Sequence, residues 1–257
     1  MRSIWTGAIG FGLVNIPVKL FGAVEESSLD LDMLDKKDHA NIKFKRVNEN
    51  TGKEVPWSNI VRAYNLNGKY VVLTDSDFQE AMPEKTKSID INSFVNVSEV
   101  DPMLYETPYF IEPESQGKRA YALLKTSLTK AKKAGLGSFV LRNKEHICMI
   151  KPYGNLLVLH RLRFSEELRD HKDLDIPALA PKPGELKMAL SLIKQLSEPF
   201  DIKAYKDTYS AKLMKLIKAK AAGKKTAIQP LKVVHSKTRD LMDQLKESLV
   251  NSKKKVS

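Results

Sequence analysis

Cysteine is almost absent from this sequence, and that absence is the first constraint on what the protein does. The 257 residues contain one cysteine, Cys148, so an intramolecular disulfide and a cysteine-rich zinc site are both excluded. No apolar run approaches the roughly 20 residues that a membrane-spanning helix needs. The apolar N-terminus is interrupted by glycines, Asn15 and Pro17, so we interpret it as an opening strand and not as a signal peptide. A reducing, cytoplasmic location without membrane attachment fits this composition.

Catalytic motifs are also missing. The chain has no G-x-S-x-G, H-E-x-x-H or dinucleotide-binding fingerprint, and Gly223-Lys224-Lys225-Thr226 fails as a P-loop because Lys218 stands where its first glycine is needed. His146 and Cys148 would share one face of a strand, as two metal ligands or a Cys–His pair, but a packed strand pair is favoured because no further Cys or His is near. His160, inside an apolar strand, is interpreted as a core histidine. We therefore predict no enzyme, no metal and no cofactor.

Acidic residues are scarce in the last third of the chain. Overall there are 43 Lys and Arg against 31 Asp and Glu, a net charge of +12. Residues 1–174 hold 25 basic and 23 acidic residues, whereas residues 175–257 hold 18 and 8. Such an asymmetry favours a polyanionic partner, usually nucleic acid, over a merely soluble basic surface.

The first two-thirds of the sequence predict a mainly β fold. Short apolar segments recur between turn signals, which is typical of a barrel or sandwich. Asn67-Gly68 predicts a hairpin between Val61–Leu66 and Lys69–Leu73, and Pro152–Asn155 predicts a second turn. One helix is expected at Lys118–Ala134, with Gly135 as its C-terminal cap. The expected strands are Ile9–Leu20, Ile42–Val47, Tyr70–Leu73, Ile89–Val97, Tyr109–Glu112, Phe139–Arg142, His146–Lys151 and Leu156–Phe164.

Beyond a proline-rich hinge at residues 174–183, the apolar period becomes helical. Helices are expected at Glu185–Leu196, Ile202–Ala222 and Thr238–Val250, with a flexible stretch before the last and a short lysine tail after it. The apolar stripes of the first two would pack against a partner subunit; a membrane-surface helix is the alternative. The dimer-interface candidates are Leu186, Leu190, Ile193, Tyr205, Tyr209, Leu213 and Leu216.

Three basic regions are candidates for binding DNA phosphates: the segment around residues 36–69, the end of the helix at 118–134, and the arm at 203–225, which contains eight lysines and one acid. Cations at a helix C-terminus are also favoured by the helix dipole, which is an equally good explanation of the second region. Lysine predominates over arginine, and this suits phosphate contacts more than base readout. The candidates are Lys36, Lys37, Lys43, Lys45, Arg46, Lys53, Arg62, Lys69, Lys130, Lys132, Lys133, Lys215 and Lys218.

Several motifs occur in a fixed order along the chain. The first is Trp5-Thr6-Gly7-x-Ile9-x-Phe11-Gly12-Leu13-Val14-x-Ile16-Pro17-Val18-Lys19-Leu20, followed by Gly68–Thr74 and Pro108-Tyr109-Phe110. The last are Tyr205-x-Asp207-x-Tyr209 and Asp240-Leu241-Met242-x-x-Leu245-x-x-Ser248-Leu249. In these motifs and their order the sequence resembles the bacterial Ku proteins, and the resemblance covers nearly the whole chain.

This resemblance implies an α+β, mainly β, fold: a Ku-type β-barrel core over residues 1–175 with a bridge insertion at about 25–70 and the helix at 118–134. A helical arm at 184–223 would support dimerisation and DNA binding, and the segment 224–257 would carry a ligase-docking helix at 238–250. Two copies would interlock into a ring that threads onto double-stranded DNA ends and recruits the ATP-dependent DNA ligase D for non-homologous end joining, in the bacterial cytoplasm at the nucleoid. The docking candidates are Leu241, Met242, Leu245 and Leu249.

The sequence departs from the Ku pattern in two places, and two other functions stay open. Many relatives resemble zinc proteins near His39, but Val47–Lys53 contains no cysteine, and the lysine tail is short. A general nucleoid-type duplex binder is one alternative. The other is an end-binding protein with a secondary abasic-site lyase activity, which requires a lysine with a lowered pKa.

Overall fold

The computed structural model describes residues 1–25, 29–82, 87–224, 242, 244–248 and 250. The chain groups into two compact units. The first consists of Met1–Glu26 and Asp30–Asp170, and the second of Ser27–Leu29 and His171–Ser257.

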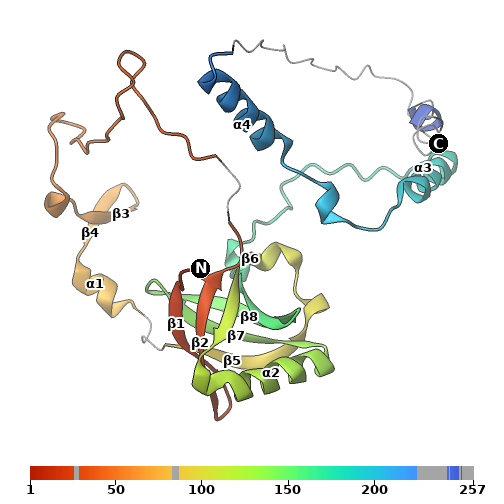
Figure 1. The fold of residues 1–257 in the computed structure, drawn as a ribbon, viewed down its shortest axis with the longest axis horizontal. Helices are drawn as coiled ribbons and strands as arrows, with labels where there is room; N and C mark the ends of the chain where they lie inside the picture. The colour runs from red at the N-terminus through yellow and green to blue at the C-terminus, as the bar shows by residue number, and fades with distance from the viewer. Residues whose placement is uncertain (26–28, 83–86, 225–241, 243, 249, 251–257) are drawn as a thin grey trace. The chain divides into compact units, whose positions relative to one another are not determined.

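Seven strands of the first unit form a closed barrel in the order β1-β2-β6-β9-β8-β7-β5 (Figure 1). Neighbours pair antiparallel except at the closing seam, where β1 and β5 run parallel. Every second side chain points inward, and the inward set is apolar, for example Ile16, Val18 and Leu20 on β2. Where β7 pairs with β5, a Cβ on Gly137 would lie 2.0 Å from the Asp90 carbonyl oxygen, so only glycine fits there. The strands are β1 Trp5–Phe11, β2 Val14–Gly22, β5 Ser88–Asn96, β6 Tyr105–Pro113, β7 Lys133–Leu141, β8 Lys144–Tyr153 and β9 Leu156–Leu162.

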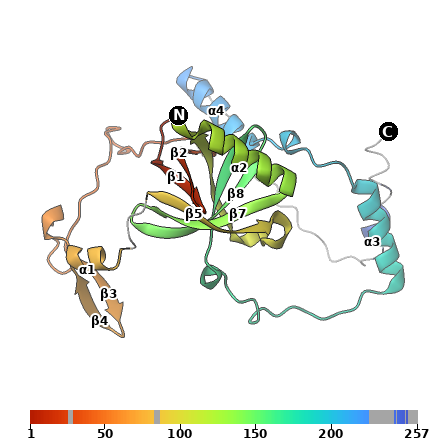
Figure 2. The ribbon, with the colours of Figure 1, turned by 90° about the horizontal axis from the view of Figure 1, so that it is seen from below.

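Helix α2, Lys118–Ala131, closes one end of the barrel (Figure 2). Its apolar face, Leu124 and Leu128, joins the same buried cluster as the inner faces of the strands. The buried Tyr121 hydroxyl donates to the Ile111 carbonyl at 2.8 Å and accepts the Leu157 N–H at 2.7 Å. These bonds tie the helix to the ends of β6 and β9, so the opposite end of the barrel is the open one.

Residues 29–82 lie between β2 and β5 and contribute no barrel strand. They contain a separate two-stranded hairpin of β3, Arg62–Leu66, and β4, Lys69–Leu73, followed by α1, Asp75–Glu80. Asn67 and Gly68 both have positive φ at its turn, as the sequence predicts. Thr74 and Asp77 form a capping box at the start of α1. No residue of the hairpin is buried.

In the second unit, α3 spans Pro183–Leu196 and α4 spans Thr208–Ala221. Asp207 caps α4 by accepting the Ser210 N–H at 3.0 Å. Residues 242, 244–248 and 250 are helical, in line with the helix expected at Thr238–Val250, of which the rest lies outside the described residues.

Several expected elements differ from the observed ones. The strand expected at Ile42–Val47 is wrong, because this stretch forms only one isolated bridge, Val47 with Glu54, and has no neighbouring strand to pair with. Ile9–Leu20 is two strands joined by a turn at Gly12, where φ is +58°.

Two expected helices are also shorter than predicted. Helix α2 ends at Ala131, and Lys132 is its C-terminal cap in the left-handed conformation, while Gly135 lies inside β7 and is not the cap. The helix expected at Ile202–Ala222 is a short 3₁₀ turn, Ile202–Ala204, followed by α4, because the Asp207 cap starts a new helix.

Candidate nucleic-acid interface

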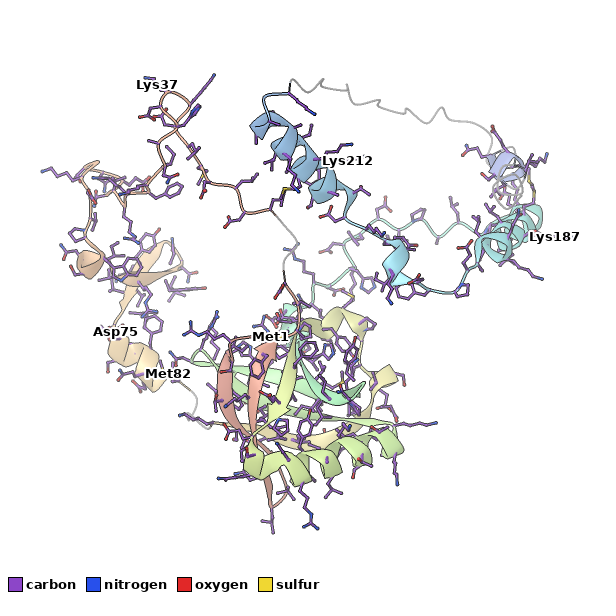
Figure 3. The ribbon with its side chains drawn as sticks, in the orientation of Figure 1. Met1, Lys37, Asp75, Met82, Lys187 and Lys212 are labelled. Atoms are coloured by element: carbon purple, nitrogen blue, oxygen red, sulfur yellow. The ribbon has the colours of Figure 1, made fainter. Side chains whose placement is uncertain are left out.

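The cations of residues 29–82 divide into two groups. Lys45 pairs with Glu54 at 2.7 Å, the Arg46 guanidinium lies 4.4 Å from the centre of the Trp57 ring, and Arg62 pairs with Asp75 at 3.2 Å while it stacks on Phe78. The side chains of these three residues contact other side chains of the same segment. The other candidates here are exposed and make no ion pair within the described residues; Figure 3 shows the side chain of Lys37 directed outward from its loop. They are Lys36, Lys37, Lys43, Lys53 and Lys69.

The hairpin brings two candidates to one face. Residues that face each other across an antiparallel pair point to the same side, and Arg62 lies opposite Leu73 while Lys69 lies opposite Leu66. With two-residue alternation along each strand, Arg62 and Lys69 share a face with Tyr64 and Val71. The hairpin thus presents its cations together, whereas Lys43 and Lys45 have no strand to hold them on one side.

The cations at the end of α2 do not act as one group. Lys130 and Lys132 are exposed at the last turn, where the helix dipole favours them, but Lys133 begins β7 and is half-buried beside Glu99. Hydrogen bonds from Asn96 lower the pKa of Glu99, and the charge of Lys133 adds to this effect. Lys133 is therefore the least available of the three to an external phosphate.

Helix α4 places two of its four lysines away from its apolar stripe. It contains Lys212, Lys215, Lys218 and Lys220 and no acidic residue. At 100° per residue, Lys215 and Lys218 lie on the side of the helix opposite Tyr209, Leu213 and Leu216. All four lysines are exposed, and Lys212 is labelled in Figure 3. The cap residue Asp207 is the nearest acid in sequence, and its hydrogen bonds with Ser210 lower its pKa.

The dimer-interface candidates are mostly exposed. Leu186, Leu190, Ile193, Tyr205, Tyr209 and Leu216 are between 43% and 76% exposed, and Leu213 is half-buried. The docking candidates Met242 and Leu245 are half-buried, and the terminal methyl of Met242 lies beside Gly184 at the start of α3. Leu241 and Leu249 lie outside the described residues.

The residues that resemble reactive groups are packed inside the barrel or against its outer wall. Burial raises the pKa of the Cys148 thiol to about 12, and Cys148 is fully buried. His146 packs against Phe139, and burial together with Arg161 lowers its pKa. His160 stacks edge-on against Tyr105, and its pKa is likewise lowered by burial.

Two further features are absent from the described residues. Among them no group of three or more His, Cys, Asp and Glu could hold a metal ion, and His39 sits in a loop turn with φ of +58°. None of the described lysines is buried. Over the same part of the chain, no helix has the length and apolar character needed to cross a membrane.

Sequence reasoning missed the aromatic partners Trp57 and Phe78 and the arginines Arg161 and Arg163. Trp57 lies 11 residues from Arg46 and Phe78 lies 16 residues from Arg62, so no local sequence pattern predicts that they stack. A signal for Arg161 does exist, because strict alternation in β9 puts it on the face of Leu157 and Leu159.

Fold and site together define a closed β-barrel protein that carries exposed cationic segments outside the barrel. Residues 10–188 match the family model described as the Ku70/Ku80 beta-barrel domain. The chain belongs to the Ku family, as its resemblance predicts.

Three curated relatives illustrate the match, and each bears the name non-homologous end joining protein Ku. The protein of Opitutus terrae is 40% identical over 254 residues, covering 97% of this chain and 91% of its own. That of Coxiella burnetii is 35% identical, covering 98% and 96%. That of Pseudomonas aeruginosa is 37% identical, covering 94% and 85%. The similarity thus extends past the barrel into the helical arm and the C-terminal segment.

Proposed function

We propose that this protein binds the ends of double-stranded DNA breaks in non-homologous end joining, without reading their sequence. Non-homologous end joining is the process stated in the names of its relatives. The observation that carries the binding chemistry is α4, where Lys215 and Lys218 project opposite an apolar stripe with no acid in the helix. Lysine is a mobile point charge that suits phosphates, and phosphate contacts are the same for every sequence.

The contacts of two arginines also support binding that does not depend on base sequence. Specific contacts to guanine rely on a free guanidinium fork. Arg46 and Arg62, the arginines of residues 29–82, have their guanidinium groups over Trp57 and Phe78. The exposed lysines Lys36, Lys37, Lys43, Lys53 and Lys69 are left to contact the backbone, with Lys130 and Lys132 as a further patch.

The assembly that fits this role is a homodimer closed into a ring. The exposed leucines and tyrosines of α3 and α4 form apolar stripes, and a self-complementary apolar surface is what a twofold dimer needs. A ring retains DNA by enclosing it, so modest phosphate contacts are sufficient. The core at 1–175 would carry the bridge, residues 184–223 the dimerising arm, and residues 224–257 the segment that recruits the ATP-dependent DNA ligase D. The protein would act in the bacterial cytoplasm at the nucleoid and would not itself be an enzyme.

A competition assay tests threading directly. A labelled linear duplex is bound at moderate salt and challenged with the same sequence, either as unlabelled linear duplex or as a covalently closed circle. We expect the linear competitor to displace the label and the circle to fail, with no change when the sequence is scrambled. Equal competition by the circle would mean a general nucleoid-type binder and would refute the ring-threading proposal.

A further inference from the structure

The open end of the barrel contains a cavity of about 720 Å³ that the DNA proposal does not use. It lies at the end opposite α2, where β1 begins and where the hairpin turn joins β7 to β8. Its volume is within the range of about 300–1,000 Å³ that small-molecule sites occupy, and barrel mouths are a frequent place for such sites.

A charged layer lies on the inner face of the barrel at this end. Arg161 is directly opposite the buried Cys148, and His146 is two residues from Cys148, so all three share the inner face. Arg161 is paired with Glu106, and their side chains are 26% and 20% exposed. Below this layer the barrel interior is apolar. Apolar side chains could fill this end of the barrel without the desolvation cost of charged ones. The charged layer is therefore better explained by ligand binding than by packing.

Charged side chains of both signs line the cavity. The Glu106 carboxylate is shared between Arg161, which lines the cavity, and Arg163, which lies at 3.5 Å and does not line it. Arg142 and Lys144 line the cavity from the β7–β8 turn and make no ion pair within the described residues. The other lining acids are Glu145 and Glu167, and the Glu167 carboxylate already accepts the Phe164 N–H at 2.7 Å. Three lining cations thus face three carboxylates, and Arg142 and Lys144 are the two cations that an anionic ligand could pair with.

The turn that supplies these cations is a two-residue hairpin turn between the paired residues Leu141 and Lys144. Arg142 and Asn143 both have positive φ, at +52° and +68°, as a type I′ turn requires. Asparagine tolerates this region, but arginine seldom adopts it. From this turn Arg142 lines the cavity.

The remaining walls are apolar and aromatic. Tyr109, Leu141 and Phe164 line the cavity beside the cations. A ligand that complements both halves has an aromatic ring and an anionic group. A nucleotide has both.

We propose that the barrel mouth binds a nucleoside monophosphate, with its phosphate at Arg142, Lys144 and Arg161 and its base against Tyr109 and Phe164. The ligand could come from two sources, a free nucleotide or the 5′-phosphorylated terminal nucleotide of a DNA strand. Because the pKa of His146 is lowered by burial and by Arg161, a phosphate placed here would favour its protonated form and raise that pKa.

Calorimetric titration of the full-length protein with AMP, adenosine and inorganic phosphate tests the site. We expect AMP to bind about tenfold or more tightly than either fragment, because the two halves of the cavity add their contributions. Arg142→Asn, which relieves the turn strain, and Lys144→Ala should each weaken AMP binding about tenfold. Arg119→Ala, on α2 at the closed end, is the matched control and should leave it unchanged.

Histidine NMR provides a second readout, in which saturating AMP raises the pKa of His146. Undiminished AMP binding by both variants, or a His146 pKa that AMP does not move, would refute the site. Phosphate binding as tight as AMP would refute base recognition.

The source of the nucleotide is decided by competition. A 5′-phosphorylated tetranucleotide that displaces AMP, where its unphosphorylated form does not, assigns the site to a DNA terminus; failure of both assigns it to the free nucleotide. This test is independent of ring threading, since AMP binding is measured without duplex DNA.

Discussion

At the residue scale, burial decides the chemistry of the pair that most resembles a reactive centre. Cys148 and His146 lie on one inner face of β8, two residues apart, as the sequence predicts. Burial lowers the pKa of the imidazole and raises that of the thiol, because a charge there loses its hydration, and the charge of Arg161 further lowers the pKa of His146. Proximity alone therefore does not make a nucleophile, and the pair belongs to the barrel packing.

The Cys148 thiol should be unreactive in the folded protein. Its pKa of about 12 leaves almost no thiolate at neutral pH, and no part of the side chain is exposed. In an Ellman assay we expect no reaction in buffer and one thiol per chain in guanidinium chloride. Rapid labelling of the native protein would show that this face of β8 is accessible.

Acid should destabilise the fold through the two barrel histidines. The pKa values of His146 and His160 are lowered in the folded state, so the unfolded chain binds more protons as pH falls through its ordinary value of about 6.5. The free energy of unfolding should therefore decrease from about pH 7.5 to about pH 5.5 in urea titrations. His146→Gln should flatten this dependence, whereas His171→Gln, at an exposed position, should not. A His146→Gln variant with the full wild-type slope would contradict the assignment.

At the element scale, a helix organises cations better than an irregular segment does. On α4 the 3.6-residue period sets the direction of each lysine, so Lys215 and Lys218 share one side. The segment at residues 42–47 has the composition of a strand, but with no neighbour to pair with, it forms none. Its lysines are exposed without a common face.

A single lysine of α4 should change the salt dependence of DNA binding. Each phosphate contact contributes about −0.9 to the slope of log K against log salt concentration. Lys215→Ala should therefore reduce the magnitude of this slope by about 1 on any linear duplex. Lys220→Ala removes the same charge from the same helix but on the side of Tyr209 and Leu216, so we expect the slope to stay the same. Identical slopes for Lys215→Ala and the wild-type protein would exclude Lys215 from the interface.

At the scale of the whole molecule, binding DNA and recruiting the ligase should reside in separable parts of the chain. The barrel, residues 29–82 and α4 end by residue 223, and the proposed docking helix begins at residue 238. The two proposed functions therefore belong to different stretches of the sequence, and one can be removed without the other.

Deletion of residues 230–257 should spare binding to linear duplex and abolish stimulation of the partner ligase. Gel-shift and ligation assays on the same preparation measure the two activities. Replacing Lys253, Lys254 and Lys255 by alanine keeps the docking helix and is expected to retain stimulation. If the truncated protein still stimulated ligation, the docking site would have to lie elsewhere.

Much of the architecture could be predicted from local pattern. Alternating apolar residues predict the strands of the barrel, Asn67-Gly68 predicts the hairpin of β3 and β4, and the spacing of Leu186, Leu190 and Ile193 predicts α3. In each case the signal lies within a few residues, because local backbone preference and the direction of successive side chains determine the result. The charge asymmetry that favours a polyanion was likewise visible in the sequence alone.

Only the tertiary structure decided how these pieces meet. The parallel pairing of β1 with β5, the end that α2 closes and the convergence of Arg161, Glu106 and Arg142 at the other end depend on contacts between residues far apart in the chain. The stacking of Arg46 on Trp57 and of Arg62 on Phe78 likewise depends on the folded chain. It distinguishes these two arginines from the exposed lysines of the same segment. Composition counts charges, but only the packed chain determines which of them are already paired and which face a partner.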